Sequence, residues 1–251
     1  RTFWSHSIPV DVVTPAQDWS SYRLIWLPNT ALLEGPTVDA IINVVEQPDG
    51  PCVLASGNLG SYAENGRYSY KPPEGLTHAL GVRVADYDQF SPDQGDGLLS
   101  GRFGHQVVSN RVDYACLEPM ANSCAHVMLD GTVVGVERKD HRLSWISLSL
   151  ASAFGGNLPD SLLSQLLAWY GIESLFNIDR DGIIALRRVS PSGRWVLFLF
   201  NILLQPVTAR VQPKWQIARA VDLLEDAEIE IYEESFDVSF GPGSVRVIAV
   251  D

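Results

Sequence analysis

The chain has 251 residues, 46% of them hydrophobic and 10% aromatic, which is enough apolar material for one large core or two smaller ones. Its 18 Lys and Arg against 30 Asp and Glu give a net charge of -12, which repels phosphate backbones and anionic lipid. Composition therefore argues against a nucleic-acid partner, and because the longest apolar runs are too short to span a bilayer, we expect a soluble protein with no membrane partner.

The opening residues predict a helix end followed by a strand. Phe3-Trp4 is typical of the end of a helix, and residues 8–13 form the first predicted strand. A doubly wound sheet normally has another strand before such a helix, and the chain begins at Arg1 without Met. We therefore expect the polypeptide to start further upstream, with its first strand outside this sequence.

Residues 22–67 follow the pattern strand, helix, strand and loop. Residues 22–28 form a short apolar run that ends in Pro28, as expected of a strand buried in a parallel sheet. From Pro36 the apolar residues recur at helical spacing, and residues 51–57 form the next strand. The loop of residues 58–67 then lies at the carboxyl end of that strand. Ligands of open α/β sheets bind at this edge.

Regular periodicity fades between residues 68 and 113. We predict an amphipathic piece at 76–80, a strand at 82–87 and a long irregular segment around them. Aromatic residues gather here, and an aromatic-rich loop beside a sheet edge suits a protein partner. The predicted interface or binding loop consists of Asn58, Tyr62, Asn65, Arg67, Tyr68, Tyr70, Tyr87 and Phe90.

The next part of the chain predicts a hairpin, a strand and a helix. Asp130-Gly131 lies between two apolar runs, which is a strong signal for a two-residue hairpin. Residues 143–150 are predicted as a strand, and a helix with a leucine stripe follows up to Gly171. Trp26 on the first of the parallel strands and Trp169 on this helix are predicted core residues.

After residue 176 the pattern changes to short alternating strands with turn signals between them. Strands are predicted at 183–189, 195–201, 207–211, 229–233, 236–240 and 245–250. Such spacing indicates a small antiparallel β-sandwich. The predicted organisation is therefore an α/β, parallel-sheet domain over residues 1–176 and a small all-β domain over residues 177–251.

Several of these stretches together resemble a known family. Residues 8–13, 22–28 and 53–57, with Glu64-Asn65-Gly66-Arg67, look like the amidotransferase-like trimerisation domain of family 42 glycoside hydrolases, the microbial β-galactosidases. Residues 182–188 and 195–201 resemble the small β domain that closes those enzymes. The sequence departs from the family pattern at Ile202, where a polar residue is more usual.

The resemblance implies a fold, a role and partners. It implies a flavodoxin-like, class I glutamine amidotransferase-like domain followed by the β domain. In the resembled enzymes both catalytic glutamates lie on a preceding (β/α)8 barrel, which this sequence does not encode. The implied role is non-catalytic: oligomerisation as a homotrimer and support of the active-site clefts of a β-galactosidase-like glycoside hydrolase, with the barrel as upstream partner and no cofactor.

The residues themselves offer little catalytic chemistry. Ser56 is the one candidate nucleophile, but its flanks lack the G-x-S-x-G pattern of a strained elbow, and we favour a packing role. None of the five histidines begins a His-x-Glu pair, and Glu233-Glu234 are neighbours that a strand would point to opposite faces. Cys124-Ala-His126 has no second ligand pair at suitable spacing, so we predict no metal site.

Two other functional classes stay open at this point. The first is a freestanding amidotransferase-like or hydrolase enzyme that uses Ser56, and the second is a carbohydrate-binding accessory module that uses exposed aromatic residues. The three cysteines, an odd number without a C-x-x-C pair, are predicted to be reduced. We accordingly expect a cytoplasmic protein.

Overall fold

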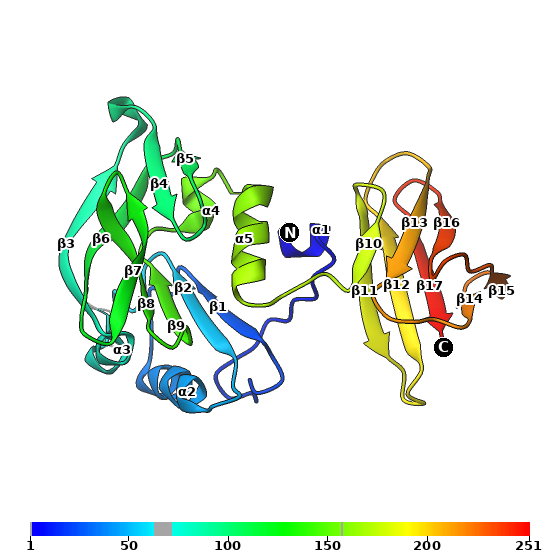
Figure 1. The fold of residues 1–251 in the computed structure, drawn as a ribbon, viewed down its shortest axis with the longest axis horizontal. Coiled ribbons are helices and arrows are strands. Elements are labelled where there is room, and N and C mark those ends of the chain that lie inside the picture. Colours follow the sequence, from blue (N-terminus) through cyan, green and yellow to red (C-terminus); the bar gives the residue numbers. More distant parts are fainter. Residues whose placement is uncertain (1, 63–71, 157) are drawn as a thin grey trace. The chain divides into compact units, whose positions relative to one another are not determined.

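The structure, a computed structural model, describes residues 2–62, 72–156 and 158–251 (Figure 1). Its contacts divide the chain into two compact units, Val13–Ile172 and a second unit in which Arg1–Val12 joins Glu173–Asp251. The predicted division lay at residue 176, with the amino-terminal segment in the first domain. No helix in the described ranges is long and apolar enough to cross a bilayer.

The Val13–Ile172 unit is built on a curled, mixed sheet of seven strands, in the order β1-β2-β9-β8-β7-β4-β5 (Figure 1). Only its first three strands are parallel to one another. The prediction of a parallel sheet is therefore right for these strands and wrong for the others, which join antiparallel. The bounds are β1 Leu24–Pro28, β2 Cys52–Ser56, β9 Leu143–Ile146, β8 Thr132–Arg138, β7 Ser123–Leu129, β4 Gly97–Gly101 and β5 Gln106–Val108.

Helices and a separate ribbon accompany this sheet. The helices are α2 (Gly35–Glu46), α3 (Glu74–Leu80), α4 (Leu150–Ala153) and α5 (Asp160–Trp169), and the ribbon pairs β3 (Val82–Phe90) with β6 (Val112–Pro119). Pro36 occupies the first turn of α2, where its missing N–H costs no hydrogen bond. The buried stripe of α2 packs into the same core as Val53 and Trp145.

The segment predicted as irregular is largely regular. Besides α3 and β3 it contains a 3-10 turn (Pro92–Gln94) and β4, and the predicted strand at 82–87 extends to Phe90. The reason is long-range pairing, since β3 pairs with β6 and β4 with β7. A register shift between Val84 and Asp86 also breaks the alternation of β3 in the sequence.

Tryptophan placement differs from the prediction. Trp26 and Trp169 are half-buried rather than core residues, and each uses its indole N–H on a polar partner, Ser56 and Glu137 respectively. Trp145 on β9 and Trp19 are the buried core tryptophans, and Trp145 Nε1 donates to the Gly57 carbonyl at 2.9 Å. An indole is amphipathic, so half-burial with a hydrogen bond satisfies it as well as full burial does.

The predicted hairpin at Asp130-Gly131 is confirmed. These residues connect β7 to β8, and their φ angles of 47° and 84° are both positive. Positive φ at both central residues is the requirement of a type I′ turn, whose twist matches that of the flanking strands. The hairpin is the antiparallel element that turns the parallel part of the sheet into a mixed one.

The other unit consists of two antiparallel sheets, β10-β13-β16 and β11-β12-β17-β14-β15. Their buried faces share one core, to which Phe176 and Phe236 contribute from the first sheet and Leu197 and Ile248 from the second. The bounds are β10 Phe176–Ile178, β13 Val207–Pro213, β16 Phe236–Phe240, β11 Ile183–Val189, β12 Trp195–Asn201, β17 Val245–Val250, β14 Ala220–Asp222 and β15 Ala227–Ile229.

The amino-terminal segment belongs to this second unit. After α1 (Thr2–Ser5), Ser7 accepts a hydrogen bond from the Ala185 amide on β11 at 3.0 Å, and Asp11 lies 3.9 Å from Arg188. Residues 8–13 form no strand, which corrects the prediction made for them. Pro9 lacks a backbone N–H, so it weakens any strand ladder through this stretch.

Candidate functional site

The carboxyl ends of β1 and β2 meet at Gly57, where the sequence predicted a site. Gly57 has a φ of +80°, and a Cβ at this position would lie 2.8 Å from Asn29 Oδ1. Its N–H donates to the Ile146 carbonyl at 2.9 Å, and its carbonyl accepts from the Trp145 indole. Glycine is therefore required here both for the backbone conformation and for the close approach of the neighbouring loop.

Asn29 ties the loop after β1 to the loop after β2. Its own φ is 49°, a conformation that asparagine tolerates better than most residues. Its N–H donates to the Ser56 carbonyl at 2.5 Å, and its side-chain Oδ1 accepts from the Asn58 amide at 3.1 Å. The sheet edge is thus held in place by backbone groups and one asparagine side chain.

A small polar pocket of about 170 Å³ lies at this edge. The residues that line it are Asn29, Gly57, Asn58, Arg111, Val112, Asp113, Ser149 and Ser152. Ser149 is the N-cap of α4 and accepts from the Ser152 amide at 3.3 Å, while Asp113 is tied to Gln89 Nε2 at 2.6 Å. The lining offers amide, hydroxyl, carboxylate and guanidinium groups but few apolar surfaces, so the pocket is suited to polar contacts.

Ser56, the one candidate nucleophile, is the last residue of β2 and directly precedes Gly57. It is only 3% exposed, and its Oγ accepts a hydrogen bond from Trp26 Nε1 at 2.9 Å. An indole N–H only donates, so this partner cannot take a proton from the hydroxyl. A working nucleophile needs a general base within reach, and Trp26 does not supply one.

The cysteines and histidines supply no obvious reactive centre either. Burial raises the pKa of the Cys52 thiol above its usual value, which keeps it protonated at neutral pH. His126 is buried on β7, and burial lowers its pKa to about 4. Among the described residues no group of three His, Cys, Asp or Glu side chains is placed to hold a metal ion.

A family model described as "Beta-galactosidase trimerisation domain" matches residues 1–136, more than half of the chain. The chain belongs to this trimerisation domain family. A curated relative, the beta-galactosidase GanA of Bacillus subtilis (strain 168), is 49% identical over 41 residues, which cover 16% of this chain and 6% of that protein.

Solved structures share the fold over nearly the whole chain. A catalytic mutant of Gan42B, a GH42 beta-galactosidase from G. stearothermophilus, matches 99% of this chain and 34% of its own length, with 16% identity and a TM-score of 0.74. The cold-adapted beta-galactosidase of Rahnella sp. R3 matches 99% of this chain and 35% of its own, with 14% identity and a TM-score of 0.71. The chain thus spans about a third of these structures.

The same fold also occurs in an enzyme whose name gives a different activity. The match to alpha-L-fucosidase isoenzyme 2 from Paenibacillus thiaminolyticus spans 100% of this chain and 44% of the fucosidase, with 13% identity and a TM-score of 0.67. Identities this low show the fold alone. The fold of the trimerisation domain therefore does not by itself specify the sugar on which a whole enzyme acts.

The predicted interface residues of this trimerisation domain differ in how far they are exposed to solvent. Asn58 lines the polar pocket, and Tyr62 is 43% exposed and bridged to Leu32, which is 52% exposed. Tyr87 is half-buried against the core, and Phe90 is only 7% exposed, so Phe90 has little surface left for a partner. The remaining four, Asn65, Arg67, Tyr68 and Tyr70, lie outside the described residues.

Of the eight residues that line the polar pocket, the predicted site residues included only Asn58. Arg111 and Asp113 lie around the start of β6, and Ser149 and Ser152 follow β9. We predicted one strand over residues 143–150, but β9 ends at Ile146 and Ser149 begins a helix. A serine before the short apolar run of α4 is an N-cap signal that would have ended the strand earlier.

A second polar cluster lies elsewhere in the Val13–Ile172 unit, around Glu137 of β8. This carboxylate is fully buried and accepts hydrogen bonds from Arg102 at 2.6 Å, from the His141 ring at 2.8 Å and from Trp169 Nε1 at 3.0 Å. The Arg102 guanidinium also stacks over the Trp169 ring at 3.4 Å. Burial opposes ionisation of Glu137, but the hydrogen bonds from Arg102 and His141 outweigh it and lower its pKa. The cluster joins β8, α5 and two loops, which indicates a structural role.

Proposed function

We propose that this chain is the assembly and support region of a longer glycoside hydrolase of the β-galactosidase type. The observation that carries the proposal is the family match over residues 1–136, the part of the chain that holds α2 and most of the mixed sheet. In this proposal the parent protein has a catalytic (β/α)8 barrel upstream, acts on a β-galactoside and resides in the cytoplasm. The chain itself carries no catalytic centre, and the Ser56–Trp26 hydrogen bond supports that part of the proposal.

The proposal also includes the finer fold assignment. The parallel strands β1, β2 and β9, with α2 in the crossover between the first two, support a flavodoxin-like, amidotransferase-like ancestry for the Val13–Ile172 unit. The shared core of the two antiparallel sheets supports a β-sandwich in the other unit. In this interpretation the polar pocket at Gly57 is what remains at the ligand edge of the ancestral sheet.

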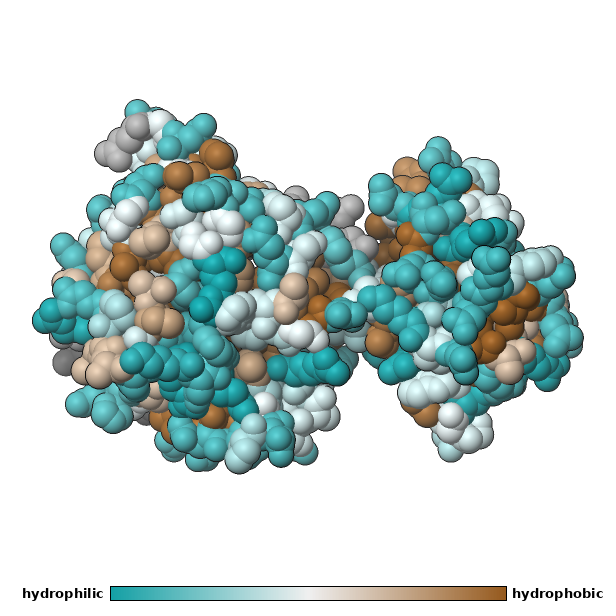
Figure 2. All heavy atoms as spheres, in the orientation of Figure 1, coloured by the Kyte–Doolittle hydropathy of each residue, from teal (hydrophilic) through white to brown (hydrophobic). Residues whose placement is uncertain are grey.

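We assign a contact surface for a homotrimer to the outer face of β5, β4 and β7. Leu98 and Val107 are register partners on β4 and β5, and Met128 faces Ser100, two residues further along β4. The three side chains therefore share one face, and they are 44%, 56% and 37% exposed. Figure 2 shows apolar residues interrupting a largely hydrophilic surface over β4 and β5.

Burial of this outer apolar patch would favour assembly over repulsion. Three copies of a chain with a net charge of -12 repel one another, so contact requires a surface on which charge is scarce. The three side chains of the patch are not among the predicted interface residues, although Leu98 and Val107 lie in the stretch of residues 68–113 where periodicity fades. Closed threefold symmetry would use the patch once on each subunit.

The experiment is a matched pair of valine substitutions followed by sedimentation velocity. Val107→Arg places a charge in the patch, and Val189→Arg makes the same change on β11, at a residue 54% exposed against 56% for Val107. We expect Val107→Arg to shift the chain toward monomer and Val189→Arg to leave the assembly unchanged. Equal behaviour of the two variants would contradict the assigned surface.

A further inference from the structure

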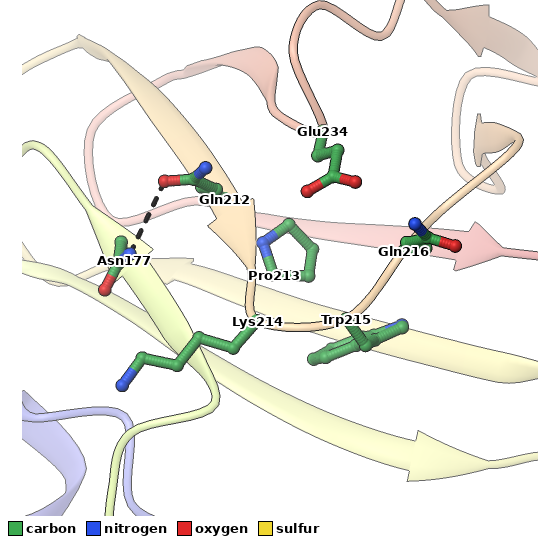
Figure 3. A pocket seen from close by; sticks show the side chains of 7 residues that line it. All are labelled: Asn177, Gln212, Pro213, Lys214, Trp215, Gln216 and Glu234. Atoms are coloured by element: carbon green, nitrogen blue, oxygen red, sulfur yellow. Dashed lines mark hydrogen bonds between the residues drawn. The ribbon is translucent and has the colours of Figure 1, made fainter.

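A second pocket lies in the Glu173–Asp251 part of the chain, outside the site described above (Figure 3). It has a volume of about 390 Å³, and the residues that line it are Asn177, Gln212, Pro213, Lys214, Trp215, Gln216 and Glu234. Sites for small molecules typically fall between about 300 and 1,000 Å³. The pocket is therefore large enough for a small polar molecule.

The base of this pocket is the ring of Trp215. The ring is half-buried and held from the side of the core, with Phe176 edge-on at 5.4 Å between ring centroids, Trp195 at 6.4 Å and the Arg187 guanidinium at 4.9 Å. In Figure 3 the ring is seen on edge, with Glu234 on the side away from the strands beneath it. The pocket thus has a flat, fixed apolar surface below polar groups.

Two amides form one wall of the pocket. Asn177 on β10 and Gln212 on β13 are register partners, and both are exposed on the outer face of their sheet. Asn177 Nδ2 donates to Gln212 Oε1 at 3.4 Å, as the dashed line in Figure 3 shows. Each primary amide has further donor or acceptor capacity beyond this one bond. That capacity is available to hydroxyl groups of a ligand.

Glu234 reaches the pocket from a tight turn. The turn is closed by two backbone bonds, from the Tyr232 amide to the Ser235 carbonyl at 2.7 Å and from the Ser235 amide to the Tyr232 carbonyl at 2.8 Å. Glu233 and Glu234 have φ angles of 50° and 62°, a left-handed conformation that is uncommon for such residues. The turn directs the Glu234 carboxylate toward the space above Trp215 (Figure 3).

The charge of the pocket favours a neutral ligand. Lys214 is paired with Glu173 at 3.1 Å, which leaves a single carboxylate, Glu234, among neutral amides. A carboxylate repels phosphate and carboxylate ligands, and Arg187 is already the cation beside the aromatic base. Amide and carboxylate groups that surround an aromatic face suit a molecule with one apolar face and many hydroxyl groups at its edge.

We propose that this pocket binds a neutral saccharide, with one pyranose ring packed on Trp215 and its hydroxyl groups bonded to Gln212, Gln216 and Glu234. Glu234 accepts from hydroxyl groups, and the amides both donate and accept. The binding site does not depend on the assembly proposed above, because every residue that lines it belongs to the unit that lacks the outer apolar patch.

The test is a titration of the ¹⁵N-labelled 251-residue chain with galactose, glucose and lactose, monitored by NMR. The indole N–H signal of Trp215, identified from its absence in a Trp215→Phe variant, is expected to shift and saturate. If lactose binds more tightly than either monosaccharide, the site contacts more than one sugar ring. If all three sugars bind equally, the site contacts a single ring. Sorbitol, which has hydroxyl groups but no ring face, is expected to give no saturating shift.

Two glutamate variants test whether binding depends on the pocket itself. Glu234→Gln removes the charged acceptor and is expected to weaken binding about tenfold, as loss of a hydrogen bond to a charged group does. Glu233→Gln makes the same change one residue away, outside the lining, and is expected to bind like the parent. No saturation with any of the three sugars, equal affinities of the two variants, or equal binding of sorbitol would each overturn the proposal.

Discussion

The cluster around Glu137 gives the sharpest prediction of stability. Replacing Glu137 by Gln keeps the size of the side chain but removes the charge that faces Arg102, whose side chain is 27% exposed. Breaking a buried ion pair costs about 3–5 kcal/mol, and the partial exposure of Arg102 reduces this to about 2–4 kcal/mol. Trp169 and Ser144 can still donate to the amide oxygen, so the variant is expected to fold.

The assay is urea denaturation, with Glu46→Gln as the matched control. Glu46 is 64% exposed and pairs with Arg138 at 2.6 Å, so its loss is expected to cost no more than about 1 kcal/mol. A loss of about 2–4 kcal/mol, divided by a urea slope of about 1–3 kcal/mol per molar, lowers the midpoint of Glu137→Gln by about 0.7–4 M. If the two units unfold in separate steps, only the step of the Val13–Ile172 unit shifts. Equal midpoints for the two variants would refute the assignment of a buried ion pair.

The pH dependence of the same variant follows from the lowered pKa of Glu137. A folded-state pKa below the unfolded value means that the carboxylate stabilises the fold above the ordinary value of 4.5. This stabilisation is lost as pH falls through the folded-state pKa. The difference between the parent and Glu137→Gln is therefore expected to be constant at neutral pH and to narrow in acid. A difference that stays constant into strong acid would contradict the reasoning.

Two further predictions concern the Gly57 edge. Gly57→Ala is expected to lower the denaturation temperature more than Gly131→Ala. Both sites have positive φ, but only at Gly57 would the new Cβ meet an atom, Asn29 Oδ1 at 2.8 Å. Equal decreases in denaturation temperature would show that this contact is relieved at no cost. The pure chain is expected not to turn over a nitrophenyl galactoside or glutamine, and turnover that disappears in Ser56→Ala would show that Ser56 is a nucleophile after all.

Local signals in the sequence predicted the local elements well. The apolar run to Pro28, the helix after Pro36 and the Asp130-Gly131 turn lie where they were expected, because each depends on residues close together in the chain. The strands of the Glu173–Asp251 part were also found from their alternation, apart from short ones such as β14 and β15. β15 ends at Ile229, where the predicted strand began.

What the sequence could not supply was pairing between distant segments. β4 pairs with β7 across a long stretch of chain, and β3 with β6, so neither shows a hairpin signal. The same limit applies to the pocket at Gly57, since Asn29, Asn58, Arg111 and Ser149 come from four separate loops or strand ends. The association of residues 2–12 with β11 is likewise a long-range contact, held by Ser7 and Ala185.

The central claim is that this chain assembles with copies of itself, and its mass in solution tests that claim most directly. Light scattering coupled to size exclusion, at micromolar concentration, measures the mass without reference to shape. The proposed trimer predicts three times the chain mass of 27.6 kDa. A mass of 27.6 kDa that persists as the concentration rises would contradict the assembly function.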